Sequence, residues 1–149
     1  MAPSLFWILL FGIAAYAIVR GDRELRTVSV ACVVATVLSH LIRSPMNDAY
    51  SGYRHVEIGV MAVDVALFAL FLVIALRSSR FWPLWVAGLH MVTVISHSVK
   101  ALRIDLMPSA YAIAAQFWGY PVLIVIAVAA FRHGRRCAHS LPPGDHAIL

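Results

Sequence analysis

The sequence predicts an all-α integral membrane protein, a polytopic bundle of about five transmembrane helices. Hydrophobic residues make up 62% of the 149 residues and charged residues only 13%, and the mean hydropathy is +0.84. Soluble domains carry about 25% charged and about 45–50% apolar residues. The apolar residues also fall into five stretches, each close to the roughly 20 residues that a helix needs to cross a bilayer.

The five predicted spans cover residues 3–19, 25–42, 56–76, 81–99 and 109–131, and we expect one bundle over residues 1–133. Residues 134–149 form a basic and then Pro/Gly-rich tail. Pro83 lies in the first turn of the fourth span, where its missing N–H does no harm. Pro121 lies inside the fifth span and predicts a kink there. The start of the chain lacks the positive charge of a signal peptide, so we interpret it as a retained first span.

Basic residues are distributed unequally between the two sides of the predicted bundle. The first and third connections and the tail carry eight arginines: Arg20, Arg23, Arg26, Arg77, Arg80, Arg132, Arg135 and Arg136. The second and fourth connections carry Arg43, Arg54, Lys100 and Arg103. Because positive residues favour the cytoplasm, we expect a multi-pass inner-membrane protein with a periplasmic N-terminus and a cytoplasmic C-terminus. These positions indicate contact with membrane lipid and argue against nucleic-acid binding.

The third span contains two carboxylates, Glu57 and Asp64, which are seven residues apart and share a helical face. A carboxylate inside a membrane is costly and needs a partner or a proton. The candidate partners are His40 on the second span and His90 and His97 on the fourth. Asp64 lies roughly 12 Å from the outer end of its span. We therefore expect a cluster of histidines and carboxylates in the outer half of the bundle.

This cluster predicts a metal- or haem-binding membrane protein or redox subunit. His40 and His97 have matched depths, as two axial ligands of haem b would, and Arg43 and Arg103 would hold the propionates at the same mouth. Histidine and carboxylate side chains are also the usual ligands of divalent transition metals. A metal ion would take its ligands from His40, His97, Asp64, Glu57 and His90. The HxxxH and HExxH motifs are absent from the sequence.

Three other hypotheses fit the same residues. In a proton-coupled carrier, Asp64 would exchange the proton, His90 would pass it on, and Trp118 and Tyr120 would line a pocket. In a non-catalytic membrane subunit, the polar cluster would be structural. In an enzyme acting on a lipid or quinone, a histidine would be the general base, although the sequence offers no clear nucleophile. Since the first span is almost free of polar residues, we expect a homo-oligomer or a subunit of a larger membrane complex.

Overall fold

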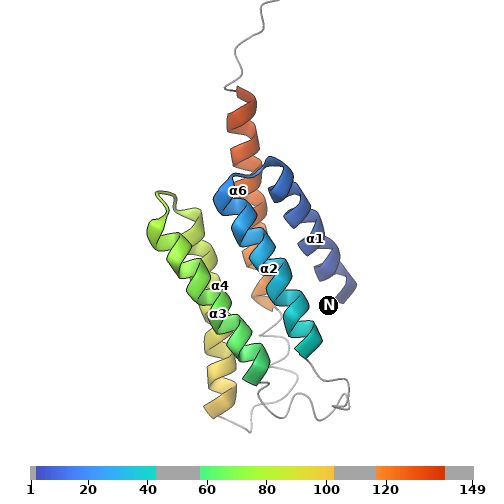
Figure 1. The fold of residues 1–149 in the computed structure, drawn as a ribbon, viewed down its shortest axis with the longest axis vertical. Helices are drawn as coiled ribbons and strands as arrows, with labels where there is room; N and C mark the ends of the chain where they lie inside the picture. Colours follow the sequence, from blue (N-terminus) through green and yellow to red (C-terminus); the bar gives the residue numbers. More distant parts are fainter. Residues whose placement is uncertain (1–2, 43–57, 103–116, 140–149) are drawn as a thin grey trace, which may run out of the picture.

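The computed structural model describes residues 3–42, 58–102 and 117–139, and these residues form an all-α fold (Figure 1). Within these ranges there are five helices: α1 (Pro3–Arg20), α2 (Arg23–Ile42), α3 (Ile58–Arg77), α4 (Trp82–Leu102) and α6 (Gly119–His139). The described ranges contain no strand. The predicted all-α class is therefore confirmed for this part of the chain.

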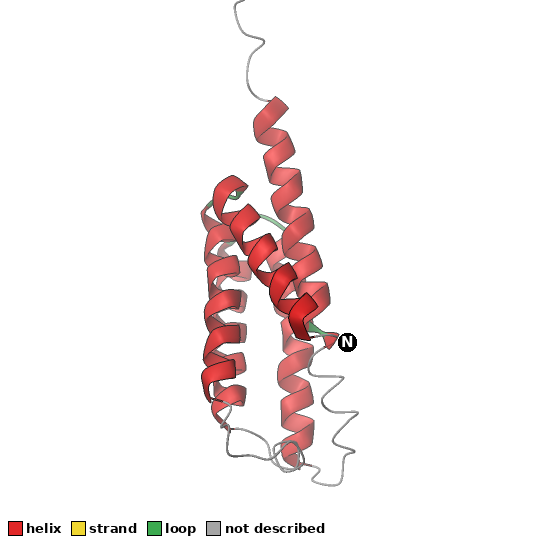
Figure 2. Ribbon diagram, turned by 90° about the vertical axis from the view of Figure 1, so that its right-hand side faces the viewer, coloured by secondary structure: helices red, strands yellow, loops and turns green. Residues whose placement is uncertain are grey.

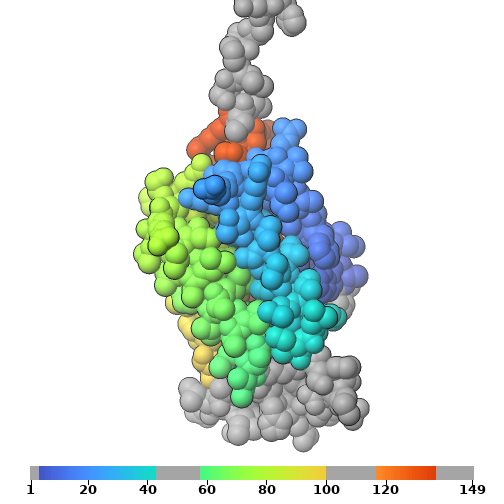
Figure 3. Space-filling view, viewed as in Figure 1, coloured from blue at the N-terminus to red at the C-terminus, as the bar shows by residue number. Residues whose placement is uncertain are grey.

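The helices run alternately in opposite directions, as Figures 1 and 2 show. α2 packs against α3, α3 against α4, α4 against α6, and α6 against α2, so these four close a ring. α1 packs against both α2 and α6. Figure 3 shows α1, α2 and α3 side by side across one face of the molecule. The bundle therefore has two ends, at which alternate helix termini meet.

The two ends differ in composition. We call one the arginine end, because Arg20, Arg23 and Arg77 lie there at the termini of α1, α2 and α3. The carboxyl-terminal part of α6 extends beyond the other helices on this side (Figures 1 and 2). We call the other the opposite end, and it collects the termini Pro3, Ile42, Ile58, Leu102 and Gly119.

The turn between α1 and α2 is set by Gly21 and Asp22. Asp22 caps α2, because its Oδ1 accepts a hydrogen bond from the Leu25 N–H and its carbonyl oxygen accepts one from the Arg26 N–H, both at 3.0 Å. Gly21 is needed for close approach of the two helices. A Cβ atom there would lie 2.3 Å from the carbonyl oxygen of Ala17. These local contacts reverse the chain within two residues.

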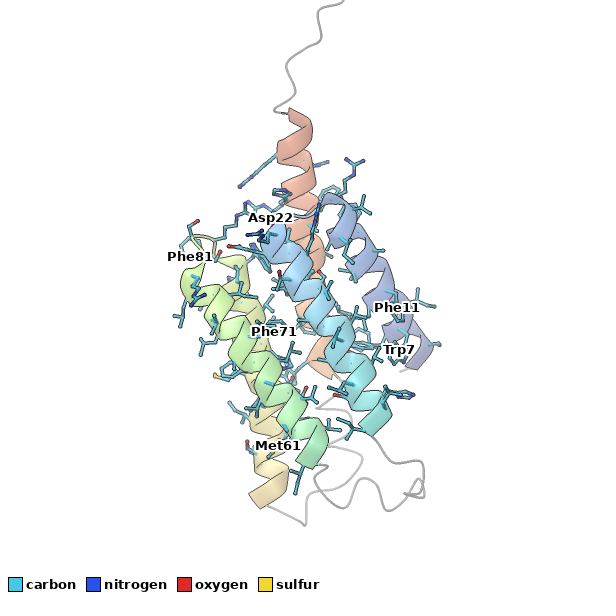
Figure 4. All side chains as sticks on the ribbon, in the orientation of Figure 1. Trp7, Phe11, Asp22, Met61, Phe71 and Phe81 are labelled. Atoms are coloured by element: carbon cyan, nitrogen blue, oxygen red, sulfur yellow. The ribbon has the colours of Figure 1, made fainter. Side chains whose placement is uncertain are left out.

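The interior between the helices is apolar and draws on every described helix. Its most deeply buried apolar members are Leu10, Ala17, Leu25, Val28, Phe71, Val86, Ile126 and Ala130. Phe71 is the largest of these side chains, and Figure 4 shows it between Asp22, near the arginine end, and Met61, toward the opposite end. Buried protein interiors are sensitive to changes of one methyl group.

The fifth predicted span differs from the observed helix. Sequence periodicity predicts a helix over residues 109–131 with a kink at Pro121, but α6 begins at Gly119 and has Pro121 in its first turn. Phe117 is helical and Trp118 forms a turn, so the helical path is interrupted just before Pro121. Pro121 itself lies where it removes no internal hydrogen bond of α6. α6 also continues to His139, so the first residues of the predicted tail are helical. Residues 109–116 and the predicted connection over 43–55 lie outside the described residues.

Two of the described helices, α2 and α3, are long and apolar enough to cross a membrane. Such helices are weak evidence by themselves, because the core helix of a soluble protein and a signal sequence pass the same test. Two is fewer than the five spans predicted. α1 is apolar but shorter over Ser4–Arg20, and α4 and α6 mix apolar residues with histidines, serines or arginines.

The close approach at Gly21 makes a testable prediction. Gly21→Ala should lower the free energy of unfolding by about 1–3 kcal/mol, because the added methyl group displaces the Ala17 carbonyl or the Leu25 side chain. Gly88→Ala is the matched control, since a Cβ atom at Gly88 has nothing within 4 Å. Denaturant unfolding of both variants in detergent, followed by tryptophan fluorescence, measures the difference. Equal stabilities would show that the Gly21 contact is unimportant.

Candidate functional site

Asp64 of α3 lies against two histidines of α4, and this is the polar centre of the bundle. His90 and His97 are seven residues apart, so both imidazoles project from one face of α4. The Nε2 atom of His97 lies 2.9 Å from Asp64 Oδ2. The Nε2 atom of His90 lies 3.9 Å from Asp64 Oδ1 and 3.1 Å from the Asp64 backbone oxygen. Asp64 of α3 is thus contacted by two side chains of α4 that lie two helical turns apart.

The three side chains are largely withdrawn from the surface. The side chain of Asp64 is 15% exposed, that of His90 10% and that of His97 9%. Thr93 lies between the two histidines on the same face of α4 and is also buried. Because a buried polar group without a partner is unfavourable, the contact with His97 stabilises Asp64 in this position.

The geometry assigns protons to the two imidazoles. A carbonyl oxygen can only accept a hydrogen bond, so Nε2 of His90 carries a proton and donates it to the Asp64 backbone oxygen. Nε2 of His97 donates to Asp64 Oδ2 when the carboxylate is ionised. The proton between His97 and Asp64 can sit on either partner. The pair can therefore exist as an ion pair or as a neutral acid and base.

His90 also marks the inner limit of the polar centre. Its ring packs edge-on against Phe71 of α3, with ring centroids 5.4 Å apart and an interplanar angle of 75°. Phe71 belongs to the apolar interior described above. The His90 imidazole therefore contacts the Asp64 carbonyl oxygen on one side and the apolar ring of Phe71 on another.

The structure places His40 elsewhere. His40 is exposed on α2 and its ring packs edge-on against Trp7 of α1, with ring centroids 5.7 Å apart. The imidazole of His97 instead contacts α3. The two histidines predicted as a ligand pair thus contact different helices, which gives no support to haem between them. Sequence periodicity gives depth along a helix but not this rotation about the axis of α2.

Three of the predicted ligands, Glu57, Arg43 and Arg103, lie outside the described residues. Over the ranges that the structure covers, no group of three or more His, Cys, Asp or Glu side chains is arranged to hold a metal ion. The predicted aromatic pocket is also unsupported. Tyr120 packs edge-on against Phe6 of α1, with ring centroids 5.5 Å apart.

A second polar cluster, at the arginine end, was missed by sequence reasoning. Arg80 of the α3–α4 turn forms an ion pair with Asp22 of the α1–α2 turn. The hydroxyl of Ser78 donates a hydrogen bond to Glu24 Oε2 at 2.9 Å. The available signal was opposite charge in two turns on the same side of the predicted bundle. This cluster joins two helical hairpins.

Comparison of the chain with protein-family models, curated proteins and solved structures finds no match.

The Asp64–His97 contact makes a prediction about stability. In a double-mutant cycle with Asp64→Ala and His97→Ala, we expect a coupling free energy of about 1–2 kcal/mol, above the average of about 0.6 kcal/mol for polar contacts between membrane helices. The reason is that each single variant removes the contact between two largely buried polar side chains. Unfolding of the four proteins in mixed detergent micelles measures this energy.

The control cycle pairs Asp64→Ala with Ser98→Ala. Ser98 is exposed and its hydroxyl bonds to the Val94 carbonyl of its own helix, so the two effects should add. A coupling energy as small for His97 as for Ser98 would show that the ion pair is not formed.

Proposed function

We propose that this chain is a multi-pass membrane protein whose Asp64–His97 pair binds an exchangeable proton, and that it acts as a proton-coupled carrier. The observation that carries the proposal is the 2.9 Å contact between His97 Nε2 and Asp64 Oδ2 in a largely buried position. Intramembrane carboxylates and histidines recur in the proton relays of pumps and transporters. The described titratable groups that contact Asp64 are His90 and His97, both on α4.

Exposed apolar surface supports the membrane setting. Only 28% of the apolar stretch of α2 and 11% of the apolar stretch of α3 are buried inside the structure. A core helix of a soluble protein would be mostly buried. Ile58 and Leu76, near the two ends of α3, are 75% and 76% exposed. Large contiguous apolar surfaces are rare on soluble monomers. The proposed topology has five spans, with the arginine end in the cytoplasm.

The interior supports a carrier rather than an open proton channel. On α4, His90 and Trp82 are eight residues apart, roughly 12 Å along the helix. Phe71, Val86 and Leu25 fill the apolar interior and are at most 1% exposed. The Ser29 hydroxyl is buried there without a hydrogen-bond partner among the described residues. A proton at His90 would need a second conformation of the bundle to reach the arginine end.

Infrared difference spectroscopy tests the proton site. In lipid nanodiscs, the wild-type spectrum between about pH 8 and pH 5 should contain carboxyl and imidazole bands that disappear in both Asp64→Asn and His97→Gln. These bands are expected because the two groups share one proton and change together. Asp22→Asn is the control, since Asp22 is a carboxylate paired with Arg80 far from the site.

Two results would contradict the proposal. If the wild-type difference spectrum is unchanged in Asp64→Asn, the carboxylate does not exchange a proton in this range. If the variants alter only unfolding, the polar centre is structural, as in a non-catalytic membrane subunit. A separate measurement in sealed vesicles tests a carrier against an open proton channel. In a carrier, the wild-type protein should not raise passive proton permeability above that of Asp64→Asn.

Metal binding is the alternative to test, because Asp64, His90 and His97 are neighbours although the described residues do not arrange them as a metal site. The geometry favours hydrogen bonding, since 2.9 Å is a hydrogen-bond length and His90 Nε2 is directed at a backbone oxygen. We therefore expect detergent-purified protein to contain zinc, copper and iron well below one ion per chain, and no Soret band. Elemental analysis and an optical spectrum measure this. Stoichiometric metal that is lost in His97→Gln would replace the proton proposal with a metal site.

A further inference from the structure

The arginine end carries more positive charge than the described residues neutralise. Six exposed guanidinium groups there make no hydrogen bond or ion pair with any described residue: Arg20, Arg23, Arg77, Arg132, Arg135 and Arg136. Arg135 lies over the ring of Phe131, 4.6 Å from its centroid. This contact orients the guanidinium without neutralising it. We refer to these six residues as the arginine collar.

The described acidic residues at this end, Asp22 and Glu24, both contact neighbouring side chains. Asp22 caps α2 and pairs with Arg80, and Glu24 accepts the hydrogen bond of Ser78. A further arginine, Arg26, donates from Nε to the Gly21 carbonyl oxygen at 3.0 Å. Among the described carboxylates at this end, Asp22 is paired with Arg80, whereas Glu24 is bonded to a neutral hydroxyl and keeps its negative charge. The six collar arginines therefore still outnumber the described negative charge that could balance them.

A band of exposed apolar side chains lies beside the collar. Val19 is 72% exposed, Leu76 76%, Phe81 82% and Trp85 65%. Val19 and Leu76 each directly precede a collar arginine in the chain, and Figure 4 places Phe81 near this end. Cations above aromatic and aliphatic side chains are the arrangement expected at the boundary between lipid headgroups and acyl chains. A surface for soluble anions or nucleic acid would not need the apolar band.

The collar arginines lie at two levels. Arg20, Arg23 and Arg77 are at the termini of their helices, whereas Arg135 and Arg136 are on the part of α6 that extends past those termini (Figure 2). The planar guanidinium group binds phosphate oxygens in pairs. Guanidinium groups at two heights can therefore contact lipid phosphate groups that lie at different depths in the headgroup layer.

We infer that the arginine collar binds the phosphate groups of anionic phospholipids and enriches these lipids around the bundle. This inference rests on the membrane setting of the proposed function but not on its proton chemistry. Each cation near a membrane surface adds about 1 kcal/mol of attraction, which is roughly a fivefold change in binding. Surrounding lipid should therefore contain several times more anionic lipid than the bulk bilayer.

Quenching by brominated lipids tests this inference. Full-length protein with Trp7→Phe and Trp118→Phe keeps Trp82 and Trp85 near the collar and is placed in vesicles of phosphatidylglycerol and phosphatidylcholine, with one lipid brominated at a time. We expect brominated phosphatidylglycerol to quench with an apparent local excess of about fivefold. The ratio should fall toward one at high salt. The protein that instead keeps Trp7 and Trp118 is the control, and it should show a ratio nearer one.

Two arginine variants separate charge from geometry. Arg132, Arg135 and Arg136 changed together to Gln should reduce the ratio strongly, whereas the same positions changed to Lys should keep part of it. Equal quenching by the two lipids in the starting protein would overturn the inference, and so would a ratio that the Gln variant leaves unchanged.

Competition distinguishes the ligand. Loss of the ratio on adding inorganic phosphate, but not sodium chloride of equal ionic strength, would assign the collar to free phosphate and overturn the lipid inference. Loss on adding an RNA oligonucleotide would assign it to nucleic acid with the same consequence. A protein that fails to float with vesicles would overturn the membrane setting itself, whereas normal flotation with a ratio of one overturns the collar alone.

Discussion

The contact between Asp64 and His97 is the constraint on which the α3–α4 arrangement depends. α3 is apolar all round apart from Asp64 and its terminal Arg77, so its apolar residues do not determine which side faces the bundle. A carboxylate in such a helix has few acceptable surroundings. Turning it toward His97 fixes the rotation of α3, and the bond from His90 to the Asp64 backbone oxygen fixes the level at which α4 passes. Phe71, two turns further along α3, is thereby directed into the interior and against His90.

A second set of polar contacts fixes the hairpins at the other end. The pairing of Asp22 with Arg80 and of Glu24 with Ser78 joins the α1–α2 turn to the α3–α4 turn. Asp22 also caps α2, so the same carboxylate orders its own helix and the neighbouring turn. The region between these contacts and Asp64 is apolar and close-packed. The bundle is thus held by polar contacts at two levels, with a hydrocarbon layer between them.

The sequence was informative about the helices and less so about rotation. Apolar runs separated by charged turns predict the all-α class and most helix bounds, because both depend on local chemistry. The seven-residue spacing of His90 and His97 predicts a shared face on α4 for the same reason. The direction of His40 toward Trp7 depends on how α1 packs against α2, which residue spacing does not encode. The start of α6 at Gly119 was missed because the aromatic residues around it continue the apolar pattern across the helix boundary.

Stability alone gives little reason for the polar centre. Replacing a buried ion pair by well-packed apolar residues is often neutral or stabilising, and α3 would pack readily against α4 through hydrocarbon. The contacts at the arginine end join the α3–α4 turn to the α1–α2 turn. Apolar side chains cannot hold a proton inside an apolar layer, whereas a titratable group can. In the proposed function, the Asp64–His97 pair would hold this proton across the 2.9 Å contact between Nε2 and Oδ2. His90 lies beside this pair and donates a hydrogen bond to the Asp64 backbone oxygen. This bond would hold Asp64 against His97 in either charge state.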